Sequence, residues 1–392
     1  MEKIKKKINF LDWPKFTSRD VKSTKNILLS GKVNYWSGSK GREFEILFKK
    51  KFHLKYTVAI SNASIGLNLA INCLNLKKDD EVLVTPRSFI ASASCVLTTK
   101  AKPIFCDINP NTQGISIEEI KKKTTKKTKA IICVHLAGIP CEINEIVKFA
   151  NKKKIIVIED CSQAHGSKIN NRHVGSFGDF SVWSFCNDKI ISTGGEGGML
   201  STKKQKFYKK LFSMKDHGKN FHRKTPASKL YFKYIHDDMG SNYRMTEIQA
   251  QLGINQLRQI DSTAKRRFKI FKTLNNKIKK TKLLEDIKVP KNYFVSAYRV
   301  YLYAKNKKIR NFFLNKINRN GIECNQGTCP EIYKEKLFKE FKKIICKNAK
   351  EIGEKSICLP SHQLIDDKKL NYMVKTINKV ISDAENKFIN EC

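Results

Sequence analysis

The sequence has no long apolar run. No stretch of 18 consecutive apolar residues occurs in its 392 residues, and no apolar signal segment follows the basic start Met1–Lys7. We therefore expect neither a membrane-spanning helix nor a secreted protein. With 40% hydrophobic residues and no long Pro/Ser tract, a chain of this length can bury a large core, which predicts two domains in one body.

Paired cysteines are also missing. The twelve Cys stand singly, without a C-x-x-C pair and without a Cys/His cluster at zinc spacing, so the sequence predicts no metal site. Several of these Cys lie inside apolar runs, as buried free thiols do. This pattern indicates a reducing compartment, and we expect a cytoplasmic protein.

Acidic residues are scarce relative to basic ones. The chain has 36 Asp and Glu against 77 Lys and Arg, which gives a net charge of +41. Such an excess is typical of proteins that bind nucleic acids or anionic membranes. Here, however, the charge is almost all Lys and is spread along the chain, whereas base and phosphate recognition favour Arg. We therefore expect no nucleic acid and no membrane as partner, although the field should attract anionic small molecules such as nucleotide diphosphates.

Short apolar runs alternate with helical patterns from residue 56 to residue 160. The strand-like runs are Tyr56–Ile60, Glu81–Thr85, Pro103–Asp107, Ala130–Val134 and Ile155–Ile158. The helical patterns between them are Ser64–Cys73, Phe89–Leu97, Ser116–Lys122 and Glu142–Ala150. This alternation predicts an α/β fold whose mainly parallel central sheet is covered by helices on both faces. Ligands of such sheets bind beyond the carboxyl ends of the strands.

Two of these strand ends carry residues suited to ligand binding. After the first strand, small and hydroxylated residues, including Ala63 and Ser64, begin a helix. The free N–H groups at this helix start could bind a phosphate, or the Ser and Asn side chains could be ordinary N-caps. Asp160 follows a buried strand, where a carboxylate needs a cationic partner, either a structural Arg or Lys or a bound group. Gln163 beside it offers an amide that a bound heterocycle could use.

A third strand end carries Lys189. This lysine follows the apolar strand Phe180–Phe185, which contains Ser184, and precedes the glycine-rich turn Gly194–Gly198. Alone, it could be a solvated lysine on a hairpin loop. Together, a phosphate seat, the Asp160 carboxylate and a lysine are the groups that pyridoxal phosphate requires, for its phosphate, its pyridine nitrogen and its aldehyde respectively.

The motifs around these residues resemble those of the DegT/DnrJ/StrS family of sugar aminotransferases. Residues 61–67 resemble its S-G-T-A-A-L loop, with Ala63 and Ser64 replacing Gly and Thr. Three further stretches resemble D-x-A-Q-A-H-G, S-F-x-x-x-K with G-E-G-G, and G-x-N-Y-R-M: Asp160–Gly166, Ser184–Gly198 and Gly240–Met245. The Gly194-Gly195 doublet makes the turn one residue longer than the common form. The resemblance implies the fold-type-I architecture of pyridoxal-phosphate enzymes.

The resemblance also implies a role for individual residues toward the cofactor. Lys189 corresponds to the catalytic lysine that bonds to the cofactor, Asp160 to the partner of the pyridine nitrogen, and Gln163 to the neighbour of the phenolic oxygen. Four further positions correspond to phosphate ligands and to the aromatic that stacks on the ring: Ala63, Ser64, Ser184 and Phe89, the last being the aromatic.

Other residues correspond to positions at a subunit interface or in a substrate pocket. Asn242 resembles a residue that reaches the phosphate of the neighbouring subunit, which implies a homodimer with active sites at the interface. His217, Tyr243 and Asn325 could line the sugar pocket, or could be ordinary polar loop residues.

The resemblance extends to the domain organisation. A strand-like run at Tyr298–Tyr303 and helical patterns at Lys308–Ile322 and Lys369–Ile381 suggest a smaller C-terminal α/β domain, preceded by a long helical pattern at Arg244–Leu283. We expect an N-terminal arm, a large cofactor-binding domain and a small domain, over residues 1–35, 36–258 and 259–392.

The expected activity is transfer of an amino group, from L-glutamate as donor, to a nucleotide-linked keto sugar, for amino-sugar and surface-polysaccharide biosynthesis. Two alternatives remain open. One is another pyridoxal-phosphate reaction, either sugar dehydration or amino-acid transamination. The other is a non-catalytic basic binding or regulatory protein on the same fold. The sequence leaves open which nucleotide sugar is used and whether its keto group is at position 3 or 4.

Overall fold

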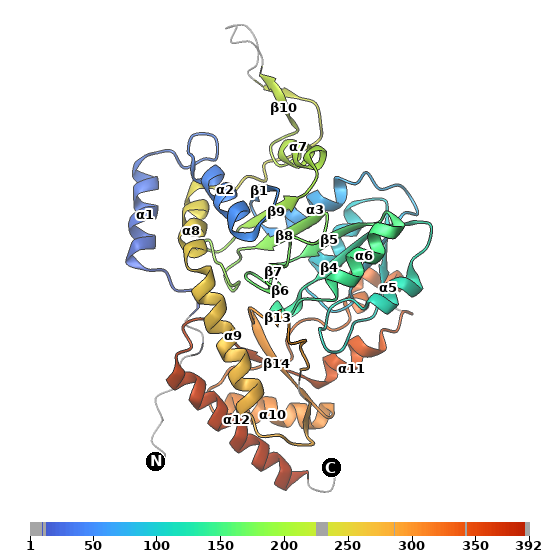
Figure 1. Ribbon diagram of the computed structural model, residues 1–392, viewed down its shortest axis with the longest axis vertical. Helices are drawn as coiled ribbons and strands as arrows, with labels where there is room; N and C mark the ends of the chain where they lie inside the picture. The colour runs from blue at the N-terminus through green and yellow to red at the C-terminus, as the bar shows by residue number, and fades with distance from the viewer. Residues whose placement is uncertain (1–9, 11–12, 225–233, 286, 342, 389–392) are drawn as a thin grey trace.

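The computed structural model describes residue 10 and residues 13–224, 234–285, 287–341 and 343–388 (Figure 1). Within these ranges, no helix combines the length and the apolar character that crossing a membrane requires.

A seven-stranded sheet in the order β1-β9-β8-β5-β4-β2-β3 forms the centre of the molecule. Its strands are β1 (Tyr56–Ile60), β2 (Glu81–Val84), β3 (Lys102–Phe105), β4 (Thr128–Val134), β5 (Ile156–Asp160), β8 (Phe180–Ser184) and β9 (Gly198–Thr202). Neighbouring strands are parallel except at β9, which is antiparallel to both β1 and β8. The predicted mainly parallel sheet is therefore confirmed.

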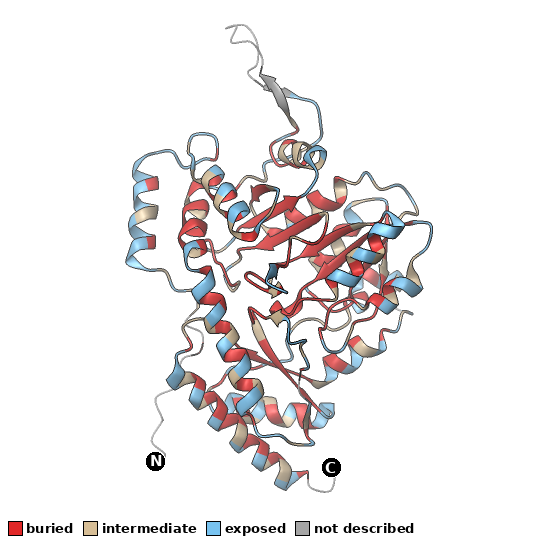
Figure 2. Cartoon of the chain, viewed as in Figure 1, coloured by how far each residue is buried: buried red, intermediate tan, exposed pale blue. Residues whose placement is uncertain are grey.

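Helices cover both faces of this sheet, and alternate residues of its strands pack against different helices. On one face, Val182 and Leu200 join the same core cluster as Leu67 of α3. On the other face, Trp183 and Met199 pack in a second cluster with aromatic residues of α2. Figure 2 shows the strands buried and the outer sides of the helices exposed. The covering elements are α2 (Lys40–Phe52), α3 (Ala63–Asn72), α4 (Ala91–Ser94), the 3-10 helix η1 (Cys95–Thr98), α5 (Ile117–Lys123), α6 (Ile143–Lys153), α7 (Gln205–Met214) and α8 (Glu247–Arg258).

A smaller antiparallel sheet, β12-β14-β15, lies in the lower part of Figure 1 together with the C-terminal helices. Its strands are β12 (Leu284–Glu285), β14 (Arg299–Ala304) and β15 (Ser356–Pro360), and its helices are α10 (Lys307–Arg319), α11 (Lys347–Lys355) and α12 (Asp367–Lys387). The long helix α9 (Ile260–Lys277) runs from the region of the large sheet to this one.

Two short β-structures complete the fold. The hairpin of β10 (Lys219–Lys224) and β11 (Tyr234–His236) projects from the top of Figure 1. A three-stranded sheet joins β6 (Lys168–Ile169), β7 (Arg172–His173) and β13 (Tyr293–Phe294) in the order β13-β6-β7.

The expected N-terminal arm contains a helix, α1 (Ser18–Leu29), that the sequence analysis did not predict. A capping box between Thr17 and Asp20 starts it, and this pair was visible in the sequence. Asn255 of α8 donates a hydrogen bond to Asp20 at 2.9 Å, which fixes α1 against the large sheet's helices. Elsewhere, the predicted helix over 89–97 is correct in position, but it divides into α4 and η1.

Candidate active site

Asp160 ends β5 and is 5% exposed. Its Oδ2 accepts a hydrogen bond from the Ser92 hydroxyl at 2.8 Å, and its Oδ1 accepts one from the Ser162 N–H at 3.1 Å. Among the described residues no Lys, Arg or His nitrogen lies within 4.0 Å of this carboxylate. The described part of the chain therefore does not provide the cation that a buried carboxylate requires, which leaves the carboxylate for a bound group.

The start of α3 forms a backbone cradle. The side chain of its N-cap, Asn62, accepts a hydrogen bond from Ile65 N–H at 3.0 Å. The N–H groups of Ala63 and Ser64 precede the first intrahelical donor and so remain available for an anion. A Cβ placed on Gly198 would lie 2.9 Å from Ala63 N, which explains the need for glycine there.

The sheet register brings Ser184 to this cradle. Gly198 of β9 pairs with Ile60 on one side and with Ser184 on the other. Ile60 is the last residue of β1, two positions before the cap of α3. The three predicted phosphate ligands, Ala63, Ser64 and Ser184, thus lie at one edge of the sheet, at the carboxyl ends of β1 and β8.

Lys189 lies in the turn between β8 and β9, and its side chain is 18% exposed. Its ammonium group lies 3.2 Å from the Tyr298 hydroxyl and 3.2 Å from Asp188 Oδ1. The same hydroxyl donates to Asp188 Oδ2. Burial alone would lower the pKa of Lys189, but Tyr298 and Asp188 outweigh it and hold this pKa above its usual value. The indole N–H of Trp13 donates to the Lys189 carbonyl at 2.7 Å.

Two hydrogen bonds through the backbone of Ala137 connect the Gln163 side chain to Tyr298, the residue whose hydroxyl contacts Lys189. Its Oε1 accepts from the Ala137 N–H at 2.8 Å, and the Ala137 carbonyl accepts from the Tyr298 N–H at 2.9 Å. The first bond fixes the orientation of the Gln163 amide, whose NH₂ then remains for another partner. Sequence analysis assigned no role to Trp13, Ser92, Asp188 or Tyr298, because nothing in a local motif links them to Lys189.

His165 is fully buried next to the lysine turn. Neither ring nitrogen has a hydrogen-bond partner in the described part of the chain, and the ring lies 5.3 Å from Trp183 and 5.7 Å from Phe185. Burial, followed by the charges of Lys189 and Arg267, lowers the pKa of His165 to about 3. The imidazole is therefore neutral at pH 7. It belongs to the D-x-A-Q-A-H-G-like stretch, yet no function was predicted for it.

Substitution His165→Asn should weaken the acid sensitivity of folding. The pKa of His165 is lower in the folded than in the unfolded state, so the unfolded chain binds more protons and stability is lost as pH falls from about 6.5 toward 3. Over that range, each pH unit of acidification should cost the parent protein about 1.4 kcal/mol more of its free energy of unfolding than it costs the variant. Urea unfolding at pH 7, 6, 5 and 4 measures this slope; identical slopes would contradict it.

The residues predicted to stack on the cofactor ring, to reach the neighbouring subunit or to line the sugar pocket lie mostly at the surface. Phe89, three positions before Ser92, is 65% exposed. Tyr243 is half-buried, and its carbonyl accepts from the Ser61 N–H at 2.9 Å, next to the phosphate cradle. Exposed Asn242 precedes it, and exposed His217 contacts the same segment through Ser241. Asn325 lies on a different element, paired with Cys358 of β15.

A buried group of His135, Glu159 and Cys161 resembles a metal site, with ligand atoms within 4.8 Å of one another. Its acceptors are already used. Glu159 accepts three backbone N–H groups from residues 175–178, as well as the 3.0 Å hydrogen bond of His135 Nε2. The Nδ1 of His135 accepts from Cys141 N–H, so Nε2 carries the proton. Hydrogen bonds therefore engage the imidazole and the carboxylate of this group, and we assign it no metal.

The chain matches the model of the DegT/DnrJ/EryC1/StrS aminotransferase family over residues 14–378. It belongs to this family. It is 35% identical over 355 residues to GDP-perosamine synthase of Escherichia coli O157:H7, covering 89% of this chain and 93% of that protein. It is 36% identical to UDP-N-acetyl-3-dehydro-alpha-D-glucosamine 3-aminotransferase of Acidithiobacillus ferrooxidans, over 54% of this chain and 55% of that one. An aminotransferase structure from Psychrobacter cryohalolentis superimposes with a TM-score of 0.92 at 35% identity, covering 96% of this chain and all of that one.

Enzymes of the DegT/DnrJ/EryC1/StrS family use pyridoxal 5′-phosphate, and this chain is a transferase of that kind. The residues present fit the cofactor. A carboxylate that no cation of the described residues contacts, a helix start with unused N–H groups and a half-buried lysine follow the carboxyl ends of strands at one edge of the sheet. When bound, the cofactor supplies an aldehyde and an electron-withdrawing ring. Asp160 would hold a proton on its ring nitrogen, and the Lys189 amine would carry the proton between the substrate carbon and the cofactor carbon in each half-reaction.

Tyr298→Phe should slow amine transfer by about tenfold with little change in KM, because the variant loses the hydroxyl that holds the Lys189 amine without changing the shape of the side chain. The 3.2 Å contact between Lys189 and Asp188 should preserve part of the positioning. Steady-state rates measured from pH 6 to 10 test this. Lys189 takes up a proton only as the free amine, so activity is lost as the pH falls, and this acidic limb should shift to lower pH because Tyr298 no longer raises the pKa of the lysine. An unchanged rate and pH profile would show that the hydroxyl has no role in the reaction.

Proposed function

We propose that this enzyme transfers an amino group from L-glutamate to a nucleotide-linked keto sugar, and that a GDP-linked keto sugar is the first acceptor to test. The family makes amino sugars, and the match to GDP-perosamine synthase covers nearly the whole chain. The observation that carries the proposal is the Asp160 carboxylate, which is buried, lacks a cation among the described residues and lies on the same sheet edge as the Lys189 turn.

The donor half-reaction separates the remaining alternatives. The cofactor-loaded protein should absorb visible light, and L-glutamate alone should bleach the band as the amino group is transferred to the cofactor. A colourless protein that cannot bind the cofactor would indicate a non-catalytic binding protein. A band that glutamate and other amino acids leave unchanged would indicate a sugar dehydratase.

The acceptor half-reaction identifies the substrate. Enzyme bleached by glutamate is mixed with GDP- and UDP-linked keto sugars that carry the keto group at position 3 or 4, and with 2-oxo acids. The band should recover with one of the nucleotide-linked keto sugars, at a rate well above that with any 2-oxo acid other than 2-oxoglutarate, the keto acid of the donor. Recovery with 2-oxo acids alone would indicate amino-acid transamination.

We propose the cofactor ligands that the resemblance to the family implies. We assign the phosphate to the N–H groups of Ala63 and Ser64 and to the Ser184 hydroxyl. We propose that the Gln163 amide contacts the phenolic oxygen and that Phe89, which is exposed and so available for stacking, covers one face of the ring. We retain the proposed division into an arm, a large domain and a small domain at residues 1–35, 36–258 and 259–392.

We propose a homodimer in which Asn242 completes the partner's site. Its side chain is exposed, although the next residue borders the phosphate cradle. Exposed apolar side chains nearby in sequence and on α1 provide surface that a second copy could cover: Met239, 90% exposed, and Leu29, 75% exposed. In this arrangement, each site would combine one chain's Lys189 with the other chain's Asn242.

Mixing two inactive variants tests this arrangement. Lys189→Ala and Asn242→Ala homodimers should each have low activity. Subunits exchanged at a 1:1 ratio should recover about a quarter of the parental activity, because half of the dimers are mixed and one site in each has both intact residues. If Asn242 serves its own chain, each site of a mixed dimer has one altered residue, so no recovery should follow. Sedimentation equilibrium tests whether the protein is a dimer.

A further inference from the structure

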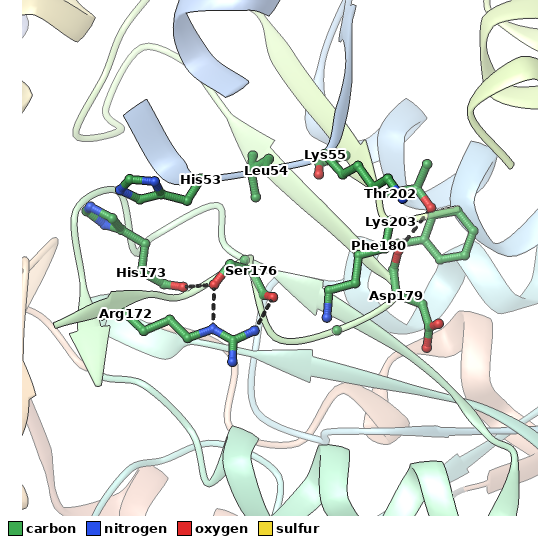
Figure 3. A pocket seen from close by; sticks show the side chains of 13 residues that line it. His53, Leu54, Lys55, Arg172, His173, Ser176, Asp179, Phe180, Thr202 and Lys203 are labelled. Carbon is green, nitrogen blue, oxygen red and sulfur yellow. Dashed lines mark hydrogen bonds between the residues drawn. The ribbon is translucent and has the colours of Figure 1, made fainter. Parts of the chain in front are cut away.

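A second cavity, of about 450 Å³, lies at the edge of the central sheet opposite Asp160 (Figure 3). It is lined by the residues that follow α2, by β7, by the loop that leads into β8 and by the end of β9. Phe180, the first residue of β8, lines this cavity, whereas Ser184, the last, belongs to the phosphate cradle. Phe180 and Ser184 are four residues apart on β8, which corresponds to about 13 Å along a strand, so the cavity is distinct from the proposed active site.

Three basic side chains line the cavity: Lys55, Arg172 and Lys203. Within the described residues, none of them lies within ion-pair distance of a carboxylate. The guanidinium of Arg172 donates instead to the Ser176 hydroxyl at 3.1 Å and to the Ser176 carbonyl at 2.6 Å, and Lys203 Nζ donates to the Phe177 carbonyl at 2.6 Å. In Figure 3, Arg172 and Lys203 approach the cavity from β7 and from the end of β9.

The carboxylate in the lining does not neutralise these cations. Asp179 Oδ1 forms an ion pair with Lys204 at 3.0 Å, and its Oδ2 accepts from the Val157 N–H at 3.1 Å. Burial lowers the pKa of Lys203, and the carboxylates of Glu159 and Asp179 offset this effect only in part. Positive charge therefore outweighs negative charge around this concave space, and the three basic side chains remain exposed and accessible to a ligand.

A buried imidazole adds a further polar group. His173 is 6% exposed, its Nδ1 has no hydrogen-bond partner among the described atoms, and it is one of the lining residues. The His53 ring stacks on it, with the ring centroids 6.3 Å apart. The loop 175–178 at the base is held by three backbone hydrogen bonds to Glu159, so the lining is already ordered.

We propose that this cavity is a second binding site, specific for a small phosphate-bearing anion. A guanidinium and two ammonium groups that line one cavity suit a multiply charged oxyanion, because charge-assisted hydrogen bonds to phosphate can satisfy both kinds of group. The volume lies within the range of small-molecule sites. The positive field of the whole chain raises the local concentration of such anions.

Calorimetric titration of the cofactor-loaded enzyme with inorganic pyrophosphate tests the site. The loaded enzyme is used because the cofactor's own phosphate then fills the cradle at α3. Arg172→Gln and Lys203→Gln should each weaken pyrophosphate binding by about tenfold. Lys206→Gln, which removes the same charge from an exposed position on α7 outside the cavity, should leave the affinity unchanged. All three variants should retain amine transfer, which shows that they are folded.

A parallel titration with inorganic phosphate distinguishes the size of the anion. Tighter binding of pyrophosphate than of phosphate, sensitive to Arg172 and Lys203, supports a diphosphate-bearing metabolite; equal binding with the same sensitivity supports a single phosphate. Absence of binding, or binding that Arg172→Gln and Lys203→Gln leave unchanged, would overturn the proposal. An equal loss in Lys206→Gln would also overturn it, because it would show attraction to the net charge alone.

Discussion

Lys189→Ala is expected to abolish amine transfer, by a factor of about 10⁴ or more, while the protein remains folded. The variant loses the only amine that the described site places at the reacting position, and with it both the bond to the cofactor aldehyde and the proton carrier. The fold should persist because the turn is fixed by backbone contacts, including the Thr193 N–H to Phe185 carbonyl bond at 3.1 Å and the bond from Trp13 to the Lys189 carbonyl.

The measurement is single-turnover bleaching by L-glutamate, with cofactor binding followed in the same sample. A small primary amine added to the solution should partly restore the rate, since it can carry the proton that the missing side chain carried. Lys206→Ala, at an exposed position, serves as the control for loss of one positive charge. Appreciable transamination by the Lys189 variant without added amine would refute the assigned role.

Asp160→Ala is expected to bind the cofactor loosely and to react about 10² to 10⁴ times more slowly. The carboxylate would stabilise a protonated ring nitrogen, and each unit by which it raises the pKa of that nitrogen corresponds to about 1.4 kcal/mol. Asp160→Asn keeps the shape and should show a similar loss of rate. Near-normal activity in either variant would mean that the cofactor is bound in a different pose.

The Asp160 carboxylate, although needed for activity, should not stabilise the cofactor-free protein. Asp160 is 5% exposed and has hydrogen bonds from Ser92 and Ser162 but no cation within reach among the described residues. Replacing this isolated buried charge with a neutral amide should therefore leave the free energy of unfolding unchanged or raise it by about 1 kcal/mol. Urea unfolding of the cofactor-free parent and Asp160→Asn measures this. A large loss of stability would show that Asp160 is mainly a structural residue.

Much of the large sheet could be predicted because its signals are local. Runs such as Tyr56–Ile60 are strands within one or two residues of the predicted bounds, since Val and Ile runs between helical patterns favour parallel strands. The order of Ala63, Asp160 and Lys189 along the chain then placed them at one edge, because strand ends of a parallel sheet meet there. The roles of these residues stay predictions until the variants are measured.

The parts that could not be predicted depend on long-range contacts. Tyr298 contacts Lys189 across 109 positions and Asp188 across 110, and no periodicity in either segment indicates this pairing. The helix α1 was missed for a different reason: its sequence is polar on most faces, and only its capping box and the contact with Asn255 reveal it. The cationic cavity was hidden because its residues come from separate segments, among lysines that are abundant everywhere.

The one antiparallel strand of the large sheet limits how the lysine turn can move. Because β9 returns between β1 and β8, both stems of the turn are hydrogen-bonded within the interior of the sheet, and neither can hinge outward without breaking ladder bonds on two sides. We therefore expect the substrate to move into position against a lysine turn whose backbone stays in place. We expect amide protons of β8 and β9 to exchange with deuterium among the slowest in the molecule, and turnover to be limited by arrival and departure of the sugar more than by loop rearrangement.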